Sequence, residues 1–198
     1  MTGDLKHDLK EKGNKTAKKM YKLAFVCAVL VLLIAFILTS GEDGFSETWL
    51  YAGVGIFVWL ILMSIINWRK AKSGNCVKKV EKYCAQTPNP EATMARLEQT
   101  WRDGGNIGIG KIDPAYIIAV RDYNVKIISL EGVTGVGKHD GMTTFQGGGA
   151  RGNIRTYSVV FMYKDGKSKS LNLDMNANAA DLIINYISQN CPEIVIGE

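Results

Sequence analysis

Hydrophobic and polar positions follow three patterns along the chain, and the first is found in two long apolar runs. Residues 23–38 (LAFVCAVLVLLIAFIL) and 49–66 (WLYAGVGIFVWLILMSII) contain no charged residue. Each run, lengthened by its flanks, reaches the roughly 20 residues that a helix needs to cross a bilayer. A cleaved secretory signal is the alternative for the first run, but the segment after it lacks a small-residue cleavage site. The pattern predicts two transmembrane helices, at about 22–39 and 49–67.

The second pattern has the period of a helix and lies in a lysine-rich segment, residues 69–103. Asn89 has the character of an N-cap, and Pro90 suits the first position of a helix. Met94 and Trp101 lie on one apolar stripe with Leu97 between them, at positions i, i+3 and i+7. We expect a juxtamembrane helical segment that ends at the following Arg-Asp-Gly-Gly.

From residue 106 onward the period changes to two, which is typical of strands. In RTYSVVFMY one face is apolar, with members Tyr157, Val159, Phe161 and Tyr163. Asp165-Gly166 has the composition of a two-residue hairpin turn. The return strand is expected to place Leu171, Leu173 and Met175 on the inner face.

Two further elements flank this hairpin. Upstream, AYIIAV and VKIISLEGVTGVGK predict an antiparallel pair, whose second strand is long enough to bend at its glycines. Downstream, NANAADLIINYISQN predicts an amphipathic helix. The residues expected on its buried face are Leu182, Ile183, Tyr186 and Ile187.

The order of these elements resembles a family of bacterial two-helix membrane proteins of unknown function. The resemblance rests on the two-helix anchor, on YSVVFMYKDGKSKSLNL and on the ending AADLIINYISQNCPEIVIGE. It implies a cytoplasmic domain of pleckstrin-homology-like (PH-like) fold that binds or scaffolds, with no catalytic residues to carry over.

The predicted fold class is therefore a membrane-anchored α+β protein. A two-helix transmembrane hairpin is followed by a strongly bent antiparallel sheet or partial barrel with a C-terminal capping helix. The expected parts are a basic tail, residues 1–21; two transmembrane helices with a short outside loop, 22–68; the helical segment, 69–103; and the PH-like domain, 104–198.

Charge is concentrated beside the apolar runs. Residues 1–22 hold seven lysines against three acids, and residues 69–82 hold six basic residues against one acid, whereas the connector 39–48 is acidic. This bias predicts a multi-pass protein of the inner (plasma) membrane with its N-terminus and C-terminal domain in the cytoplasm. The basic flank could also recruit acidic lipids, although setting the topology is the alternative role. Its members are Lys18, Lys19, Lys22, Arg69, Lys70 and Lys72.

The composition indicates little chemistry. Beyond residue 82 the chain has eleven basic and twelve acidic residues, so nucleic acid is not an expected partner. The four cysteines are scattered without a C-x-x-C pair, and there are only two histidines, so we expect no metal, no cofactor and no enzymatic activity. Ala24 and Ala28 allow a homodimer through the transmembrane helices, with ordinary packing inside the hairpin as the alternative.

The stretch EGVTGVGKH, residues 131–139, has the spacing of a phosphate-binding loop. Gly132, Gly137 and Lys138 are in register, but His139 occupies the place of the magnesium-binding hydroxyl. The residues after it also lack helix formers, although a phosphate loop needs a helix there. The alternative is that Gly132, Gly135 and Gly137 relieve strain in a twisted strand and that residues 147–149 form a mobile loop. Residues 139–153 are then a glycine-rich loop that is either functional or merely mobile.

A rim that binds an anion or a lipid headgroup is a further expectation. If the strands that end near Lys138 and begin near Arg155 pair, four basic side chains could converge: Lys138, His139, Arg151 and Arg155. A solvated basic loop is the alternative. The sequence thus predicts a non-enzymatic membrane protein that presents a binding or scaffolding domain to a protein partner or to membrane lipids. A membrane-tethered nucleotide-binding enzyme and an accessory subunit of a transport complex are the alternatives.

Overall fold

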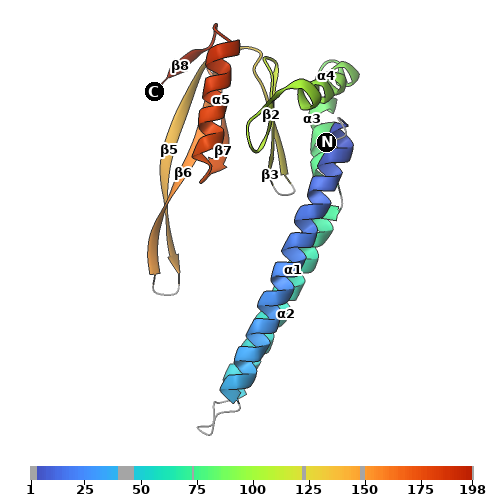
Figure 1. Ribbon diagram of the computed structural model, residues 1–198, viewed down its shortest axis with the longest axis vertical. Helices are drawn as coiled ribbons and strands as arrows, with labels where there is room; N and C mark the ends of the chain where they lie inside the picture. Colours follow the sequence, from blue (N-terminus) through green and yellow to red (C-terminus); the bar gives the residue numbers. More distant parts are fainter. Residues whose placement is uncertain (1–3, 40–46, 73, 122–123, 148–149, 198) are drawn as a thin grey trace. The chain divides into compact units, whose positions relative to one another are not determined.

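The computed structural model describes residues 4–39, 47–72, 74–121, 124–147 and 150–197 (Figure 1). The chain divides into two compact units. Of the described residues, one unit contains those between positions 6 and 78 together with Asn124, and the other contains residues 4–5, 79–121 and those between 125 and 197.

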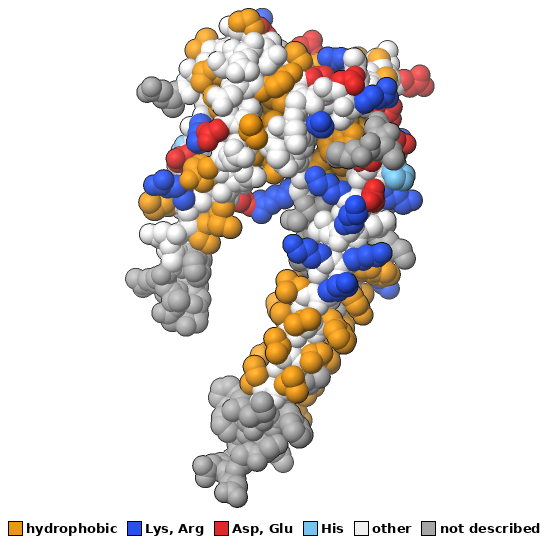
Figure 2. Space-filling view, viewed as in Figure 1, with side chains coloured by type: hydrophobic (Ala, Val, Ile, Leu, Met, Phe, Trp, Pro, Cys, Tyr) orange, Lys and Arg blue, Asp and Glu red, His pale blue; other side chains and the backbone are white. Residues whose placement is uncertain are grey.

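The first unit is built from two long helices, α1 (Leu5–Thr39) and α2 (Glu47–Lys72), which lie side by side (Figure 1). The basic tail expected over residues 1–21 is helical from Leu5 and continues into the apolar run without a break. Between the helices lies an apolar groove of about 360 Å³. Its lining includes Ala28, which is 2% exposed, whereas Phe25 is 61% exposed. Figure 2 shows apolar side chains along the surface of these helices.

The predicted transmembrane hairpin is wrong for the part of the chain that the structure describes. None of the helices there is both long enough and apolar enough to cross a membrane. The two uncharged runs have only 16 and 18 residues, and a span needs roughly 20. The flanks that were expected to lengthen them bring the charges of Lys22 and Arg69 into the same helices. The predicted multi-pass membrane localisation was inferred from this hairpin, so it is contradicted by the same finding.

Two shorter helices follow, α3 (Asn75–Ala85) and α4 (Pro90–Asp103). The predicted start of α4 is confirmed, because the Asn89 side chain accepts a hydrogen bond from the Ala92 N–H at 3.1 Å. Its apolar stripe is confirmed as well, with Leu97 and Trp101 buried. In α3, the ring of Tyr83 meets that of Tyr116 edge-on at 6.4 Å. Burial raises the pKa of Tyr83 to about 12.

The first sheet is antiparallel, in the order β1-β2-β3-β4. Its strands are β1 (Gly105–Asn106), β2 (Gly110–Ile112), β3 (Tyr116–Arg121) and β4 (Asn124–Ser129). Gly110 is required where β2 passes β3, since a Cβ there would lie 1.8 Å from the Ile118 carbonyl oxygen. The turn between these strands is organised by Asp113, which is 8% exposed.

The second sheet has the order β7-β6-β5-β8. Its strands are β5 (Val133–Gly147), β6 (Ala150–Tyr163), β7 (Ser168–Asp174) and β8 (Val195–Gly197). Neighbouring strands are antiparallel, except that β8 lies parallel to β5. The predicted hairpin between β6 and β7 is confirmed, with Gly166 at φ +76° in its turn.

Two details of the predicted strands are wrong. The single long strand expected over residues 125–138 is two strands, because the chain turns at Glu131 and at Gly132, which has φ +74°. Met175 does not lie on the inner face with Leu171 and Leu173; it is 70% exposed. The reason is Asp174, whose φ of +47° ends the alternation of β7 one residue earlier.

The last helix, α5 (Ala177–Asn190), packs against the second sheet. Its predicted apolar face is confirmed, with Ile183 and Ile187 fully buried and Leu182 and Tyr186 partly buried. Together with both sheets it forms one core, which includes Ile117, Ile128, Val136, Val159, Phe161, Leu171, Ile183 and Ile187. The α+β content is therefore as predicted, but the single strongly bent sheet or partial barrel is wrong: the described residues form two four-stranded sheets, and α5 covers their shared core.

Candidate functional site

Lys138, the residue that the phosphate-loop spacing singled out, lies in the middle of β5. Its ammonium lies 2.7 Å from a carboxylate oxygen of Asp181 on α5 and 5.4 Å from the centre of the Tyr157 ring. The hydrogen bond to Asp181 raises the pKa of Lys138 above its ordinary value. The side chain thus has partners within the fold, and it joins β5 to α5.

The glycines before Lys138 do not form a loop that could wrap a phosphate. Gly132 lies in the turn before β5, while Gly135 and Gly137 are within the strand and beside β8. The strand continues from Lys138 to Gly147, and the next element that the structure describes is β6. A phosphate loop depends on the free N–H groups of a helix directly after it, and this segment supplies none.

The other three residues of the expected anion rim do not converge with Lys138. His139 is the next residue of the strand, so its side chain is on the opposite face of the sheet. Arg155 shares the face of Lys138, but it pairs with Met142, four residues along β5. At about 3.3 Å per residue, that is roughly 13 Å away. Arg151 pairs with Gln146 still further along, and its side chain is outside the described part of the chain.

The expected basic flank is only partly described. The side chains of Lys18, Lys19, Lys22 and Arg69 are exposed on α1 and α2. Those of Lys70 and Lys72 are outside the part that the structure describes.

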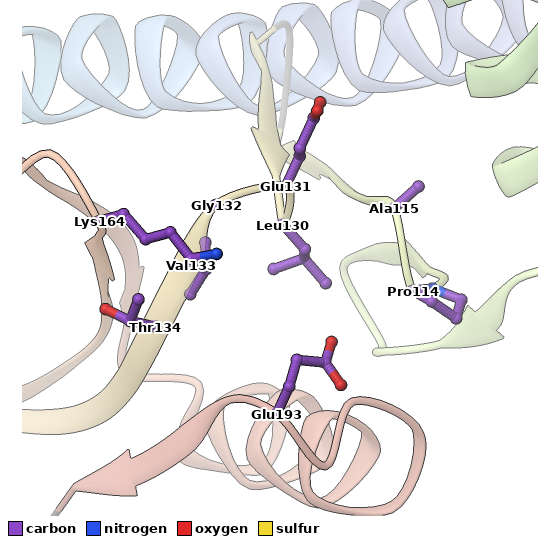
Figure 3. A pocket seen from close by; sticks show the side chains of 9 residues that line it. All are labelled: Pro114, Ala115, Leu130, Glu131, Gly132, Val133, Thr134, Lys164 and Glu193. Atoms are coloured by element: carbon purple, nitrogen blue, oxygen red, sulfur yellow. The ribbon is translucent and has the colours of Figure 1, made fainter.

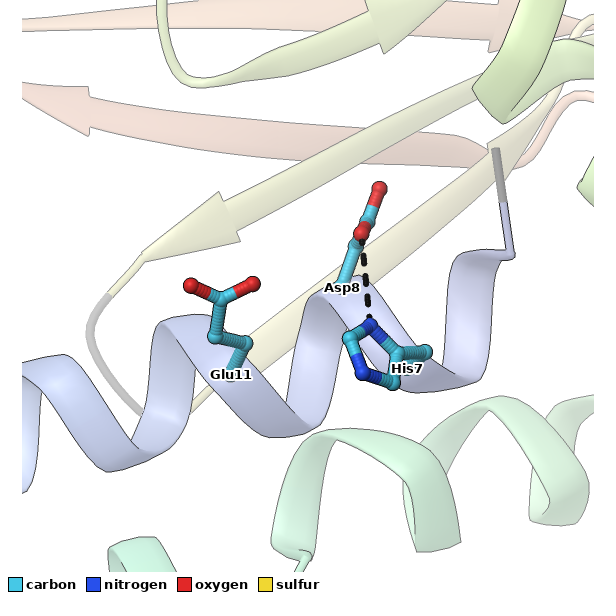
Figure 4. A group of neighbouring side chains, drawn as sticks. All are labelled: His7, Asp8 and Glu11. Atoms are coloured by element: carbon cyan, nitrogen blue, oxygen red, sulfur yellow. Dashed lines mark ion pairs between the residues drawn. The ribbon is translucent and has the colours of Figure 1, made fainter. Parts of the chain in front are cut away.

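A group of potential metal ligands occurs near the start of α1 (Figure 4). The donor atoms of His7, Asp8 and Glu11 lie within 4.8 Å of one another, and His7 Nδ1 is 3.8 Å from Asp8 Oδ1. Glu11, however, is held by Lys15 at 2.6 Å, and this hydrogen bond lowers the pKa of Glu11. A cation would have to displace Lys15, so the group is not a preformed metal site.

A surface hollow of about 480 Å³ lies beside the turn between β4 and β5 (Figure 3). Leu130 and Val133 form its apolar floor, and the ends of Lys164 and Glu193 reach toward it from two other turns. Glu131 completes the charged rim. All three charged side chains are exposed. Because a nucleophile paired with a base is missing from this lining, the hollow offers polar contacts rather than covalent chemistry.

The most unusual feature of the second sheet is a long stretch of β5 with a bare outer side. β8 pairs with β5 only at Gly135, Val136 and Gly137. Within the described residues, no other strand covers the outer side of β5 from Lys138 to Gln146, and we call these nine residues the open β5 edge. Since successive residues of an antiparallel strand point their N–H and C=O groups to alternate sides, about half of them present both groups outward.

At the far end of the same hairpin, the part of the chain that the structure describes places no third strand on either side. β7 pairs with β6 only from Tyr157 to Met162. Beyond that point the hairpin is a two-stranded ribbon, residues 141–147 and 150–156, which we call the distal ribbon; it extends past β7 and α5 (Figure 1). Besides the backbone pairing, two side-chain hydrogen bonds cross the ribbon. The Thr144 hydroxyl donates to the side-chain oxygen of Asn153 at 3.0 Å, and the Thr156 hydroxyl donates to the Gly141 carbonyl at 3.3 Å.

The opposite edge of the sheet is not bare. The Lys126 ammonium on β4 donates a hydrogen bond to the Ser170 carbonyl on β7. Arg121 at the end of β3 forms an ion pair with Asp174 at the end of β7. Side chains of the first sheet thus occupy the outer side of β7, which leaves β5 as the accessible edge.

Sequence reasoning missed the open β5 edge. It assigned residues 139–153 to a loop because glycines are frequent there. The signal that could have revealed the strand is the polar, β-branched Thr143-Thr144 opposite a strand that begins near Arg151.

A family model described as a domain of unknown function (DUF6709) matches residues 74–198, which is more than half of the chain. The chain belongs to this family. The DUF6709 match begins just before α3 and runs through α4, both sheets and α5, so it includes the open β5 edge. The chain matches no curated protein and no solved structure. The expected membership of an uncharacterised family is confirmed, whereas the family description mentions neither a membrane nor a PH-like fold.

Proposed function

We propose that residues 104–198 are a non-enzymatic protein-binding or scaffolding module, and that the partner adds an extended segment to the open β5 edge. The observation that carries the proposal is the nine-residue stretch of β5, Lys138–Gln146, which has no outer strand among the described residues, whereas β8 pairs in parallel with the preceding Gly135–Gly137. Strand addition to a sheet edge is a recurring way of binding a peptide, because main-chain hydrogen bonds supply the affinity.

The side chains of the open edge support a protein partner. From Gly141 to Gln146 the edge has no charge and no proline. Natural sheets block unused edges with lysines, prolines or bulges, and this segment has none of those devices. Met142 is 69% exposed at its centre. Residues 141–146 of the edge therefore have the composition of a surface that pairs, whereas Lys138 and Asp140 lie at the end next to β8.

The arrangement of the domain supports a PH-like assignment. Two sheets, antiparallel except for the pairing of β8 with β5, share a core with α5, and strands followed by a closing helix are the element order that the sequence resemblance implies. Domains of this kind are scaffolds on which binding surfaces vary. The near balance of charge beyond residue 82 favours protein over nucleic acid as the partner.

The nucleotide-binding alternative has less support. Lys138 is engaged by Asp181, and the segment has the geometry of a strand. Nucleotide titration of the full chain distinguishes the two ideas, because magnesium-dependent ATP or GTP binding that is lost in Lys138→Ala would favour the enzyme.

Photocrosslinking in cells that make the protein tests the proposal. With a benzophenone amino acid in place of Thr143, we expect ultraviolet light to join the full chain to a second polypeptide. The same amino acid in place of Ser168 on β7 is the control, since Ser168 is also exposed but β7 is occupied by contacts from the first sheet. We expect at least about tenfold more adduct from position 143, since the strand added to an edge lies about 5 Å away.

A second pair of variants makes the test specific for main-chain pairing. Met142→Pro and Thr143→Pro are adjacent, so only one of them removes an N–H that points away from β6. That variant should lose the adduct formed from a benzophenone at Asp140 while the domain stays folded. Equal adducts from positions 143 and 168, or an adduct that survives both prolines, would contradict strand addition at β5.

A further inference from the structure

The open β5 edge has two fixed ends, which set the length of any strand that pairs with it. At one end β8 occupies Gly135 to Gly137. At the other, β5 ends at Gly147. The nine residues between, Lys138–Gln146, have Met142 as their midpoint.

We propose that the partner strand is β5 of a second copy of this chain, antiparallel, with Met142 opposite Met142. The inference rests on the proposed function, because it names the occupant of the same edge. It predicts a two-fold symmetric dimer in which the two second sheets form one continuous sheet. A two-fold contact uses the same patch on both copies, so it closes without forming fibres.

The symmetry restricts the registers that are available. Opposite residues on paired strands point to the same face, and a two-fold axis perpendicular to the sheet keeps the faces of both copies. One residue must therefore lie opposite itself. Met142 is the only choice that pairs all nine residues, since any other centre leaves part of the edge uncovered or collides with β8.

The side chains are compatible with this register. Lys138 falls opposite Gln146, and Asp140 falls opposite Thr144, so like charges do not oppose each other. A register centred on Asp140 would place two carboxylates together on the axis. With Met142 at the centre, two flexible apolar side chains, each 69% exposed in the single chain, meet there instead.

The distal ribbon would gain stability by pairing with a second copy of the chain. An isolated two-stranded ribbon is at best marginally stable in water. Pairing of two β5 edges converts two such ribbons into one four-stranded sheet, and each copy stabilises the part of the other that its own fold leaves without a third strand. A short peptide would add one strand, whereas a second copy adds a strand that is already in an extended conformation.

Disulfide trapping of the full chain tests the register. In a Cys27→Ser background, which removes the cysteine that is exposed, Met142→Cys places one thiol on each side of the predicted axis. Directly opposite residues have Cβ atoms about 4.5–5.5 Å apart, close to the spacing of a disulfide. Mild oxidation should convert most of the chain into a covalent dimer. Met175→Cys is the matched control, because Met175 is 70% exposed but outside the edge, and we expect about tenfold less dimer from it if only opposed thiols react.

Charge at the axis gives an independent readout. Met142→Lys should place two ammonium groups together and shift the dimer toward monomer in sedimentation velocity, whereas Met175→Lys should leave the distribution unchanged. Failure of Met142→Cys to crosslink, together with equal sedimentation of the two lysine variants, would overturn the dimer. If the benzophenone at position 143 then still captures a different protein, strand addition stands and only the identity of the partner is wrong; if it captures nothing, both proposals fail.

Discussion

Replacing Asp113 with Ala is expected to lower the free energy of unfolding of the domain by about 2–4 kcal/mol, because a buried hydroxyl and two turn N–H groups lose a charged acceptor. The Asp113 carboxylate is the centre of the turn between β2 and β3. One oxygen accepts hydrogen bonds from the N–H groups of Ala115 and Tyr116, at 2.8 and 2.7 Å. The other accepts from the Thr100 hydroxyl at 2.9 Å and lies 3.1 Å from the guanidinium of Arg96.

The loss is large because four donors share this carboxylate. Without it, the buried Thr100 hydroxyl keeps only its bond to the Arg96 carbonyl, and the two turn N–H groups lose their acceptor. Asp113→Asn should cost less than Asp113→Ala, since its remaining oxygen can still accept from the turn N–H groups. Part of the loss should persist, because the amide N–H₂ would face the Arg96 guanidinium. Hydrogen exchange of the slowest amides in β3 measures the change. Asp103→Ala, an exposed acid at the end of α4, is the control and should change it by less than about 0.5 kcal/mol.

Replacing Phe161 with Ala should destabilise the same domain by about 3–5 kcal/mol, which is typical of a buried aromatic side chain. Phe161 is fully buried in the core that both sheets share with α5. Truncation removes its contacts and leaves a cavity, because the strand on each side of β6 holds the backbone in place.

Urea unfolding followed by circular dichroism measures this loss. Phe161→Leu should recover part of it, since Leu fills more of the space than Ala does. Met162→Ala, at the next position of β6 but 46% exposed on the other face, is the control. If Phe161→Ala and Met162→Ala shift the transition equally, the placement of the core between the sheets and α5 is wrong.

Local signals in the sequence predicted the elements that depend on neighbouring residues. The N-cap at Asn89, the turn at Gly166 and the buried face of α5 around Ile183 and Ile187 all appear as expected. Each depends on capping, on a positive φ or on a period of 3.6, and these act within one or two turns of the chain.

What the sequence failed to predict depends on contacts between distant segments. The distal ribbon was assigned to a loop because glycines, which have poor strand propensity, are frequent there. In the structure, the pairing of residues 141–147 with residues 150–156 outweighs that propensity. The expected anion rim failed for a related reason: alternation along β5 separates Lys138 from His139, and Asp181 comes from a helix some 40 residues later. Hydropathy alone also overestimated the length of the apolar helical segments.

The open β5 edge results from the short pairing between β8 and β5. β8 is only three residues long, so it covers Gly135–Gly137 and leaves the rest of β5 without an outer neighbour among the described residues. Its length cannot be read from the pattern Val195-Ile196-Gly197 alone, because a strand ends where its partner or its own chain turns away.

Residue-resolved hydrogen exchange across β5, measured on the full chain over a series of protein concentrations, tests whether the open β5 edge is free in one copy and pairs with a second. At the highest dilution we expect alternation from Lys138 to Gln146: amides that point to β6 exchange more slowly than those that point outward. As the concentration rises, the outward amides should become protected while Val136, already beside β8, stays unchanged. Uniform slow exchange along the whole stretch at every dilution would show that the chain covers its own edge, and would contradict an open edge that pairs between copies.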